Sequence, residues 1–439
     1  MHCSGEYKVD ANGNITCTES YVGPATGKNK KDVQPHFSFS FIMHGIHKCS
    51  GTCYYCSAAK SMSYRDQANK STFKYDWDKA EAKIFEYFKK MGWNDETCEG
   101  KAACAVDVWG GNPVENREPF KETIEFLETR IKPHFKDFVI HTSGNGLEMQ
   151  HKGLVKYLKE HDIHYQLSHD GLGQWQRTPG IDPLYCDKTK DNILDLVKNG
   201  NLDWINCTLS YRNYSFFANI EYWNKWRKEN GIWDKPITIK LNHIYPGTLP
   251  VDKVYDGPDD ENLTHGQICN GEIIGDLNFR SEQMNEYLHE FRKLALICLL
   301  PDIRNNKYFA PYINYTTGQM WRYKELKEGM SPGMCRDFQK GLIDYNFAID
   351  TIGEYSQCNL IDSSSKVLNS TAAQAPYCKG CKYEHQSECN SCGSENPEPF
   401  DPRTGRCTYK YQWLNTLEEF AQLKVLLDVL KNKSCDCKK

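Results

Sequence analysis

Three closely spaced cysteines follow a short β-prone segment early in the chain. They are Cys49, Cys53 and Cys56, in the pattern C-x3-C-x2-C. Thiolates are the usual ligands of iron–sulfur clusters, and three on one loop can hold three corners of a [4Fe–4S] cluster, leaving one iron open to a substrate. Two alternatives are a zinc site completed by His44 or His47, because structural zinc takes four protein ligands, and unrelated structural cysteines.

A second group of cysteines is dense toward the other end of the chain. In order, they are Cys335, Cys358, Cys378, Cys381, Cys389, Cys392 and Cys407. The middle four form two C-x2-C pairs seven residues apart, which is typical of a zinc ribbon or knuckle. That interpretation leaves the other three without a role, so a larger metal assembly is the alternative.

The composition indicates where in the cell the protein is located and which classes of partner it does not bind. The chain has 439 residues, twenty of them cysteine, and 58 acidic against 54 basic side chains give a net charge of −4. This balance argues against binding nucleic acid through bulk charge. The first residues lack the basic and apolar regions of a signal peptide, and the longest apolar run, Leu294 to Leu300, is too short to span a bilayer. We therefore expect a cytoplasmic protein with no membrane contact, whose thiols ligate metal.

The elements that must position these cysteines alternate between strands and helices. Strands are predicted at residues 37–42, 103–108, 138–141, 164–167, 204–209 and 237–241, with helical periodicity between them, for example at 76–90, 120–131 and 191–197. Six such units predict an α/β fold with a parallel sheet and crossover helices. Periodicity alone allows either a curled partial barrel or an open doubly wound sheet.

Composition divides the chain into four parts. They are an N-terminal arm or hairpin at 1–35, the βα domain at 36–245, an insert loop with a connecting helix at 246–324, and a cysteine-rich domain at 325–439. The segment 243–280 is rich in Pro, Gly, Asp and Asn, and is interpreted as a lid or as an ordinary solvated loop. Helices are predicted over about 281–300 and 413–430.

The cysteine loop resembles the signature of the radical S-adenosylmethionine (SAM) superfamily. The resemblance rests on Cys49, Cys53 and Cys56, with the aromatic Tyr55 before the last cysteine, just after the first strand of a βα series. It implies a partial (β/α)6 barrel whose [4Fe–4S] cluster binds SAM and cleaves it reductively to a 5′-deoxyadenosyl radical, which abstracts a substrate hydrogen. It also implies an electron donor such as flavodoxin or ferredoxin.

Further segments resemble the SAM-binding motifs of that family. Gly110, Gly111 and Asn112, followed by proline, resemble its Gly-Gly-Glu-Pro stretch, which contacts the SAM amino group. A neutral amide at the acidic position can still accept a hydrogen bond, but the charge-assisted part is lost. An ordinary turn is the alternative for this tetrapeptide.

The matches continue after the third and fourth predicted strands. Ser143 lies in Thr-Ser-Gly-Asn-Gly, which resembles the family's Thr-Asn-Gly stretch, and Ser168 lies in a segment that resembles its Ser-Leu-Asp-Gly stretch with Arg177 downstream. The resemblance implies that these three approach the SAM ribose and carboxylate. A solvated surface arginine is the alternative for Arg177. All these segments end predicted strands, where parallel barrels collect active-site residues.

The C-terminal cysteines resemble the SPASM domain of one radical SAM branch, although the later spacings differ. The resemblance implies two auxiliary [4Fe–4S] clusters, the first held by Cys335, Cys358 and Cys392 and the second by Cys378, Cys381, Cys389 and Cys407. No cysteine stands shortly before Cys335, so the first cluster has an open iron or takes a distant ligand such as Cys269, Cys298 or Cys435.

The SPASM branch chiefly modifies peptides and proteins, so we expect oxidation, cross-linking or thioether formation on a peptide or protein side chain. Asn359 stands where the formylglycine-forming members carry an aspartate, which argues against that reaction. Two alternatives are the same radical chemistry on a small molecule, sugar or nucleotide, and a non-enzymatic zinc protein. Acid–base candidates near the barrel mouth are His44, His141, His169 and Asp170, none assigned a catalytic role.

Overall fold

The structure is a computed structural model. It describes residues 7–9, 15–17, 34–46, 49–51, 53, 72–210, 213–243, 268–269, 272–273, 281–299, 306–312, 348–355, 379–382, 400–401, 406–407, 411–412, 415–420 and 422–423. Tyr55 and Cys56 lie outside these ranges. So do the C-terminal cysteines named above, except Cys381 and the backbone of Cys407.

The central element is a parallel sheet of seven strands. In spatial order these are β11 (Ala348–Asp350), β3 (His36–Ile42), β4 (Ala103–Trp109), β5 (Asp137–Gly144), β6 (Ile163–Ser168), β7 (Trp204–Leu209) and β8 (Thr238–His243). All six predicted strands are present, and each pairs in parallel with its neighbour in sequence. The seventh, β11, was not predicted, because a three-residue strand carries no readable periodicity.

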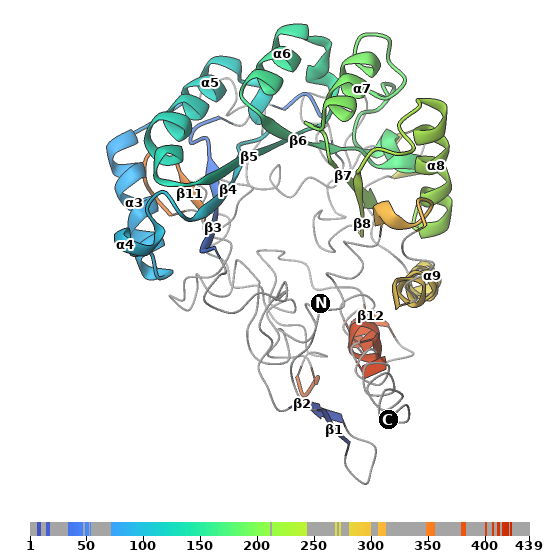
Figure 1. The fold of residues 1–439 in the computed structure, drawn as a ribbon. Coiled ribbons are helices and arrows are strands. Elements are labelled where there is room, and N and C mark those ends of the chain that lie inside the picture. The colour runs from blue at the N-terminus through green and yellow to red at the C-terminus, as the bar shows by residue number, and fades with distance from the viewer. Residues whose placement is uncertain are drawn as a thin grey trace, which may run out of the picture.

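The sheet curves, and the described helices that cover it lie on its convex face (Figure 1). These helices are α3 (Trp77–Lys90), α5 (Arg117–Phe126), α6 (Lys152–Glu160), α7 (Lys190–Asn199) and α8 (Phe216–Glu229). A doubly wound sheet carries helices on both faces. The two edges, β11 and β8, do not pair with each other among the described strands. The fold is therefore a partial barrel, as the family resemblance implies.

Burial alternates along the inner strands. In β4, Cys104, Val106 and Val108 are buried against the helices, whereas Asp107 and Trp109 on the other face are half-buried. Parallel strands covered on both faces are usually apolar throughout. Here the described helices lie on the convex side, and polar side chains alternate along the concave side of the strand.

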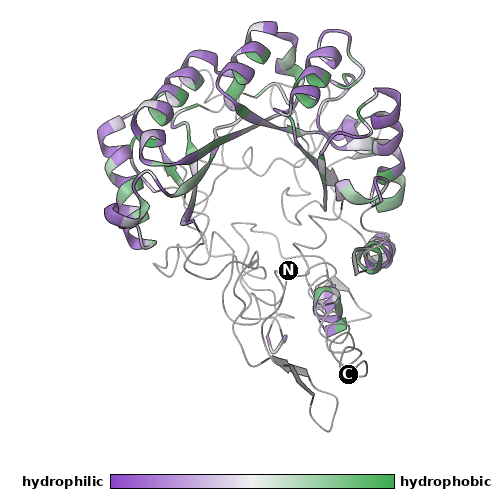
Figure 2. Ribbon diagram, viewed as in Figure 1, coloured by the Kyte–Doolittle hydropathy of each residue, from purple (hydrophilic) through white to green (hydrophobic). Residues whose placement is uncertain are grey.

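The helices are amphipathic, and Figure 2 shows their hydrophobic sides turned toward the sheet. There they pack on a core of aliphatic and aromatic side chains. Helix α3 begins at Asp76, whose side chain accepts a hydrogen bond from the Lys79 backbone N–H at 3.1 Å. Phe88 on its inner side contacts Phe37 and Phe39 of β3, with ring centroids 5.1 and 5.7 Å apart. The predicted helix at 120–131 is divided into α5 and a π-helical turn, η3 (Leu127–Ile131).

Smaller elements complete the described part. They are the antiparallel pairs β1 (Tyr7–Val9) with β2 (Ile15–Cys17), β9 (Ile268–Cys269) with β10 (Glu272–Ile273) and β12 (Phe400–Asp401) with β13 (Arg406–Cys407), the helices α4 (Asp95–Cys98) and α9 (Ser281–Leu299), and the short turns η2 (Pro113–Glu115), η4 (Lys132–His134), η5 (Leu147–Gln150) and η6 (Gly171–Gln176). Among the described helices, none has the length and apolarity needed to cross a membrane.

Candidate active site

The cysteine loop starts at the carboxyl edge of the sheet, directly after β3. The Met43 N–H donates to the Trp109 carbonyl at 2.9 Å, which continues the pairing of β3 with β4 beyond the last strand residue. Gly110 has φ +138°, and a Cβ there would lie 3.0 Å from the Cβ of Met43. Only glycine allows this close approach, so the first glycine of the Gly-Gly-Asn-Pro turn brings that turn against the start of the cysteine loop.

The sulfurs of Cys49 and Cys53 lie on the same side of their loop. A Cβ built on Gly51 would be 3.4 Å from the first sulfur and 3.7 Å from the second. Both cysteines are half-buried. Each sulfur accepts an N–H: Asn145 Nδ2 lies 3.8 Å from Cys49 Sγ, and Arg177 Nη1 lies 3.6 Å from Cys53 Sγ.

This arrangement fits the ligands of an iron–sulfur cluster. Two convergent sulfurs on a short loop, each with an N–H donor, match the thiolate ligation and the hydrogen bonding that such clusters use. The described residues contain no group of three or more His, Cys, Asp or Glu side chains placed to hold a metal ion. The third predicted ligand, Cys56, lies outside the described ranges.

Asn112 is held in one orientation by two carboxylates. Its Nδ2 donates to Glu115 Oε1 at 2.7 Å and to Glu148 Oε2 at 3.0 Å. The side chain is 1 % exposed, and its Oδ1 has no hydrogen-bond partner among the described residues. A buried acceptor without a donor is costly, so this oxygen is suited to receive a donor from a ligand.

Glu148 belongs to a buried network behind that turn. It is 3 % exposed, and the Tyr165 hydroxyl and the Gly146 N–H donate to its Oε1. Burial is the main cause that raises the pKa of Glu148, and the hydrogen bond from Tyr165 opposes it. Gly144 makes room for the pair, because a Cβ there would overlap Glu148 Oε1 and lie 2.6 Å from the Tyr165 hydroxyl.

Arg177 is fixed by a buried carboxylate rather than solvated. Asp170 is fully buried, and its Oδ1 accepts from Arg177 Nε at 3.2 Å and Nη2 at 2.9 Å. The Thr208 backbone N–H and Gln176 Nε2 also donate to this carboxylate, each at 3.0 Å. Arg177 itself is 9 % exposed and extends from the end of η6 to the cysteine loop. The surface-arginine alternative is therefore wrong.

The two predicted serines end neighbouring strands. Ser143 stands opposite Gln166 in the pairing of β5 with β6, and Ser168 stands opposite Asn206 in the pairing of β6 with β7. Ser168 is half-buried in the alternating pattern of β6, on the concave face. Ser143 is buried, and it shares that face because it follows the half-buried His141 by two residues along β5.

The acid–base candidates have varied surroundings. The His169 Nδ1 accepts from the Gly171 N–H at 3.0 Å, so its Nε2 carries the proton and donates to Asp182 at 2.9 Å. This fully buried ring is a structural brace, and Asp170 braces Arg177. The Nδ1 atoms of His44 and His141 are buried without partners among the described residues.

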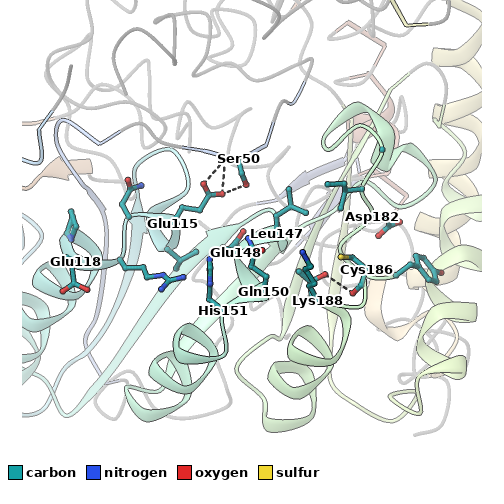
Figure 3. A pocket seen from close by; sticks show the side chains of 18 residues that line it. Ser50, Glu115, Glu118, Leu147, Glu148, Gln150, His151, Asp182, Cys186 and Lys188 are labelled. Carbon is teal, nitrogen blue, oxygen red and sulfur yellow. Dashed lines mark hydrogen bonds between the residues drawn. The ribbon is translucent and has the colours of Figure 1, made fainter. Parts of the chain in front are cut away.

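A groove of about 1200 Å³ lies beside the cysteine loop (Figure 3). It is formed by the segments that follow β4, β5 and β6, and Ser50 of the cysteine loop lies at its border. Glu115 and Glu148 line it together with charged residues of both signs, including Glu118, Arg117, Asp182 and Lys188.

The predictions did not include three of the residues that organise this site: Glu115, Glu148 and Asn145. Asn145 stands inside the predicted Thr-Ser-Gly-Asn-Gly segment. The two glutamates each lie in a short helical turn directly after β4 or β5. A polar residue in the first turn after a parallel strand is the signal that would have selected them, although surface glutamates share it.

Several solved structures resemble this chain. One is native anSMEcpe with bound AdoMet and Cp18Cys peptide, with 14 % identity and a TM-score of 0.44 over 91 % of this chain and 99 % of that one. Another is SuiB from Streptococcus suis bound to precursor peptide SuiA, with 12 % identity and a TM-score of 0.40 over 73 % and 60 %.

A third is a radical SAM methyltransferase from Sphaerobacter thermophilus, with 12 % identity and a TM-score of 0.30 over 51 % of this chain and 59 % of that one. No family model matches the chain, and no curated protein matches it.

Proposed function

We propose that the protein is a radical SAM enzyme. The observation that carries the proposal is the convergence of the Cys49 and Cys53 sulfurs, each with an N–H donor, at the carboxyl edge of a partial barrel. Cys56 would complete the set of three ligands. When bound, the [4Fe–4S] cluster supplies the electron that cleaves SAM to methionine and a 5′-deoxyadenosyl radical.

The chain's own groups would bind and orient SAM. The unpartnered Oδ1 of Asn112 would accept a hydrogen bond from the SAM amino group. Arg177, held by Asp170 beside Cys53, would pair with the SAM carboxylate. Ser143 and Ser168, on the concave face, would contact the ribose. Gly110 and Gly111 would let the backbone approach the ligand closely.

We propose that the substrate is a peptide or protein side chain, because the order of the C-terminal cysteines resembles that of a SPASM domain. Cys335, Cys358 and Cys392 would ligate one auxiliary cluster, and Cys378, Cys381, Cys389 and Cys407 a second one. These clusters would carry electrons or bind substrate. A flavodoxin or ferredoxin would reduce the SAM cluster. A small molecule, sugar or nucleotide is the alternative substrate.

Anaerobic reconstitution with iron and sulfide tests the proposal. We expect a brown protein with about twelve irons if three four-iron clusters assemble. With dithionite and SAM it should release 5′-deoxyadenosine, and a variant with Cys49, Cys53 and Cys56 all changed to alanine should not. Colourless protein that contains zinc would instead establish the structural zinc alternative. Reconstituted protein that binds SAM without cleaving it would contradict the radical chemistry.

A further inference from the structure

Ser50, inside the cysteine loop, is held from two sides. Glu115 accepts its backbone N–H at 2.9 and 3.0 Å through its two carboxylate oxygens, and accepts its hydroxyl at 2.5 Å (Figure 3). Asn145 Nδ2 donates to the same hydroxyl oxygen at 3.2 Å. Ser50 follows Cys49 directly, so these bonds restrict the backbone that carries the first cysteine.

Glu115 is itself anchored from behind. It ends the short turn η2, and Asn112 at the start of that turn donates to its Oε1 at 2.7 Å. The other amide hydrogen of Asn112 goes to Glu148, which the Tyr165 hydroxyl holds in the core. A continuous set of hydrogen bonds therefore joins the cysteine loop to η2, to η5 and to β6.

The carboxylate also changes the electrostatics of the loop. The Ser50 N–H is engaged with Glu115, so it is not available to donate to a cluster sulfur. The reduction potential of an iron–sulfur cluster depends on net charge and on hydrogen bonds to its sulfurs. A negative charge bonded to the residue next to Cys49, and one N–H fewer for the sulfurs, both favour the oxidised cluster and lower its potential.

We propose that Glu115 is a positioning residue for the cysteine loop. Together with Asn145 it holds Ser50 so that Cys49 and Cys53 converge before a cluster is assembled, and its charge keeps the cluster strongly reducing. This inference rests on the proposed function, because it needs a cluster on that loop.

The test compares Glu115→Gln with Glu118→Gln in the full-length, reconstituted protein. Glu118 lines the same groove, but its exposed carboxylate pairs with Lys121 instead of the loop. Two quantities are measured: the rate at which a chelator removes iron, and the reduction potential of the SAM cluster by EPR-monitored titration. For Glu115→Gln we expect iron loss roughly tenfold faster, the factor that matches one weakened charge-assisted hydrogen bond, and a more positive potential.

A second variant separates the hydrogen bond that holds the loop from the effect of the Glu115 charge. Ser50→Ala removes the hydroxyl but keeps the N–H and the charge of Glu115, so we expect faster iron loss at an unchanged potential. Glu118→Gln should match wild type in both measurements. If Glu115→Gln loses iron at the wild-type rate and has the wild-type reduction potential, the inference is wrong, and the proposed function is unaffected. A wild-type protein that takes up no cluster would overturn the proposed function, and the inference with it. Melting curves of the proteins without a cluster identify any variant that has failed to fold. If Glu115→Gln fails to fold, the rate of iron loss from Ser50→Ala decides.

Discussion

Arg177 bridges a buried carboxylate and a cysteine sulfur. Its Nε and Nη2 bind the fully buried Asp170, and its Nη1 reaches Cys53 Sγ at 3.6 Å. One guanidinium thereby joins the segment after β6 to the loop after β3, although two strands, β4 and β5, lie between β3 and β6 in the sheet. The planar fork of arginine suits this double role, whereas lysine offers a single point charge.

Replacing Arg177 with leucine should destabilise the protein and weaken SAM binding. The change leaves Asp170 buried without its cationic partner, and breaking a buried pair in this way costs about 3 kcal/mol of unfolding free energy. Urea denaturation and SAM titration measure the two effects. Arg117→Leu, at an exposed position where α5 begins, is the control and should change stability by less than about 0.5 kcal/mol. Equal stabilities for the two variants would contradict the bracing role.

Asn112→Asp should be more harmful than Asn112→Ala, although the resembling motif has an acidic residue here. The asparagine donates to Glu115 and Glu148, so an aspartate would place a third carboxylate against these two. We expect Asn112→Asp to be less stable than Asn112→Ala by about 1–3 kcal/mol at pH 7. The gap should close toward pH 4, because Glu148, whose pKa is raised by burial, becomes protonated. A gap that stays constant between pH 7 and pH 4 would exclude carboxylate repulsion as the cause.

Gly144→Ala should destabilise the protein by about 1–3 kcal/mol, because the added methyl group overlaps the buried Glu148 carboxylate and crowds the Tyr165 hydroxyl. Gly153→Ala is the matched control. Gly153 lies in α6, and nothing stands within 4 Å of a Cβ built there. This control should gain about 0.5–1 kcal/mol from helix propensity. Thermal unfolding of both variants checks the contrast, which fails if Gly144→Ala melts at or above the wild-type temperature.

His141 should make the fold sensitive to mild acid. Burial lowers the pKa of His141, while Asp107 opposes this shift, and His164 and Asp203 also face the ring. The unfolded chain therefore binds this proton first, and stability is lost as the pH falls below about 6.5 toward the lowered value. His141→Gln should remove this loss, so the variant gains stability relative to wild type as the pH falls.

Chemical denaturation between pH 7.5 and pH 5 measures that difference, with His36→Gln, exposed at the start of β3, as the control. If the difference between His141→Gln and wild type does not change with pH, the ring does not titrate between the folded and unfolded states.

Hydrophobic periodicity and family-like motifs predicted much of the fold. The six strands that bear apolar residues on one face, and the periodic helices such as α3, are local patterns that the sequence displays directly. The short β11 was missed, because three residues show no period and its pairing with β3 joins positions about three hundred residues apart. A contact of that separation is decided by packing and leaves no local trace.

The sequence by itself determined which groups are available for chemistry: the C-x3-C-x2-C loop, the Gly-Gly-Asn-Pro turn and Arg177 at the ends of parallel strands. Only the tertiary structure decided their partners. Asp170, and not solvent, engages Arg177, and Glu115 and Asn145 together hold Ser50. The reason is physical: strand ends meet at one edge of a parallel sheet, but which side chains bond there depends on the curvature and register of that sheet.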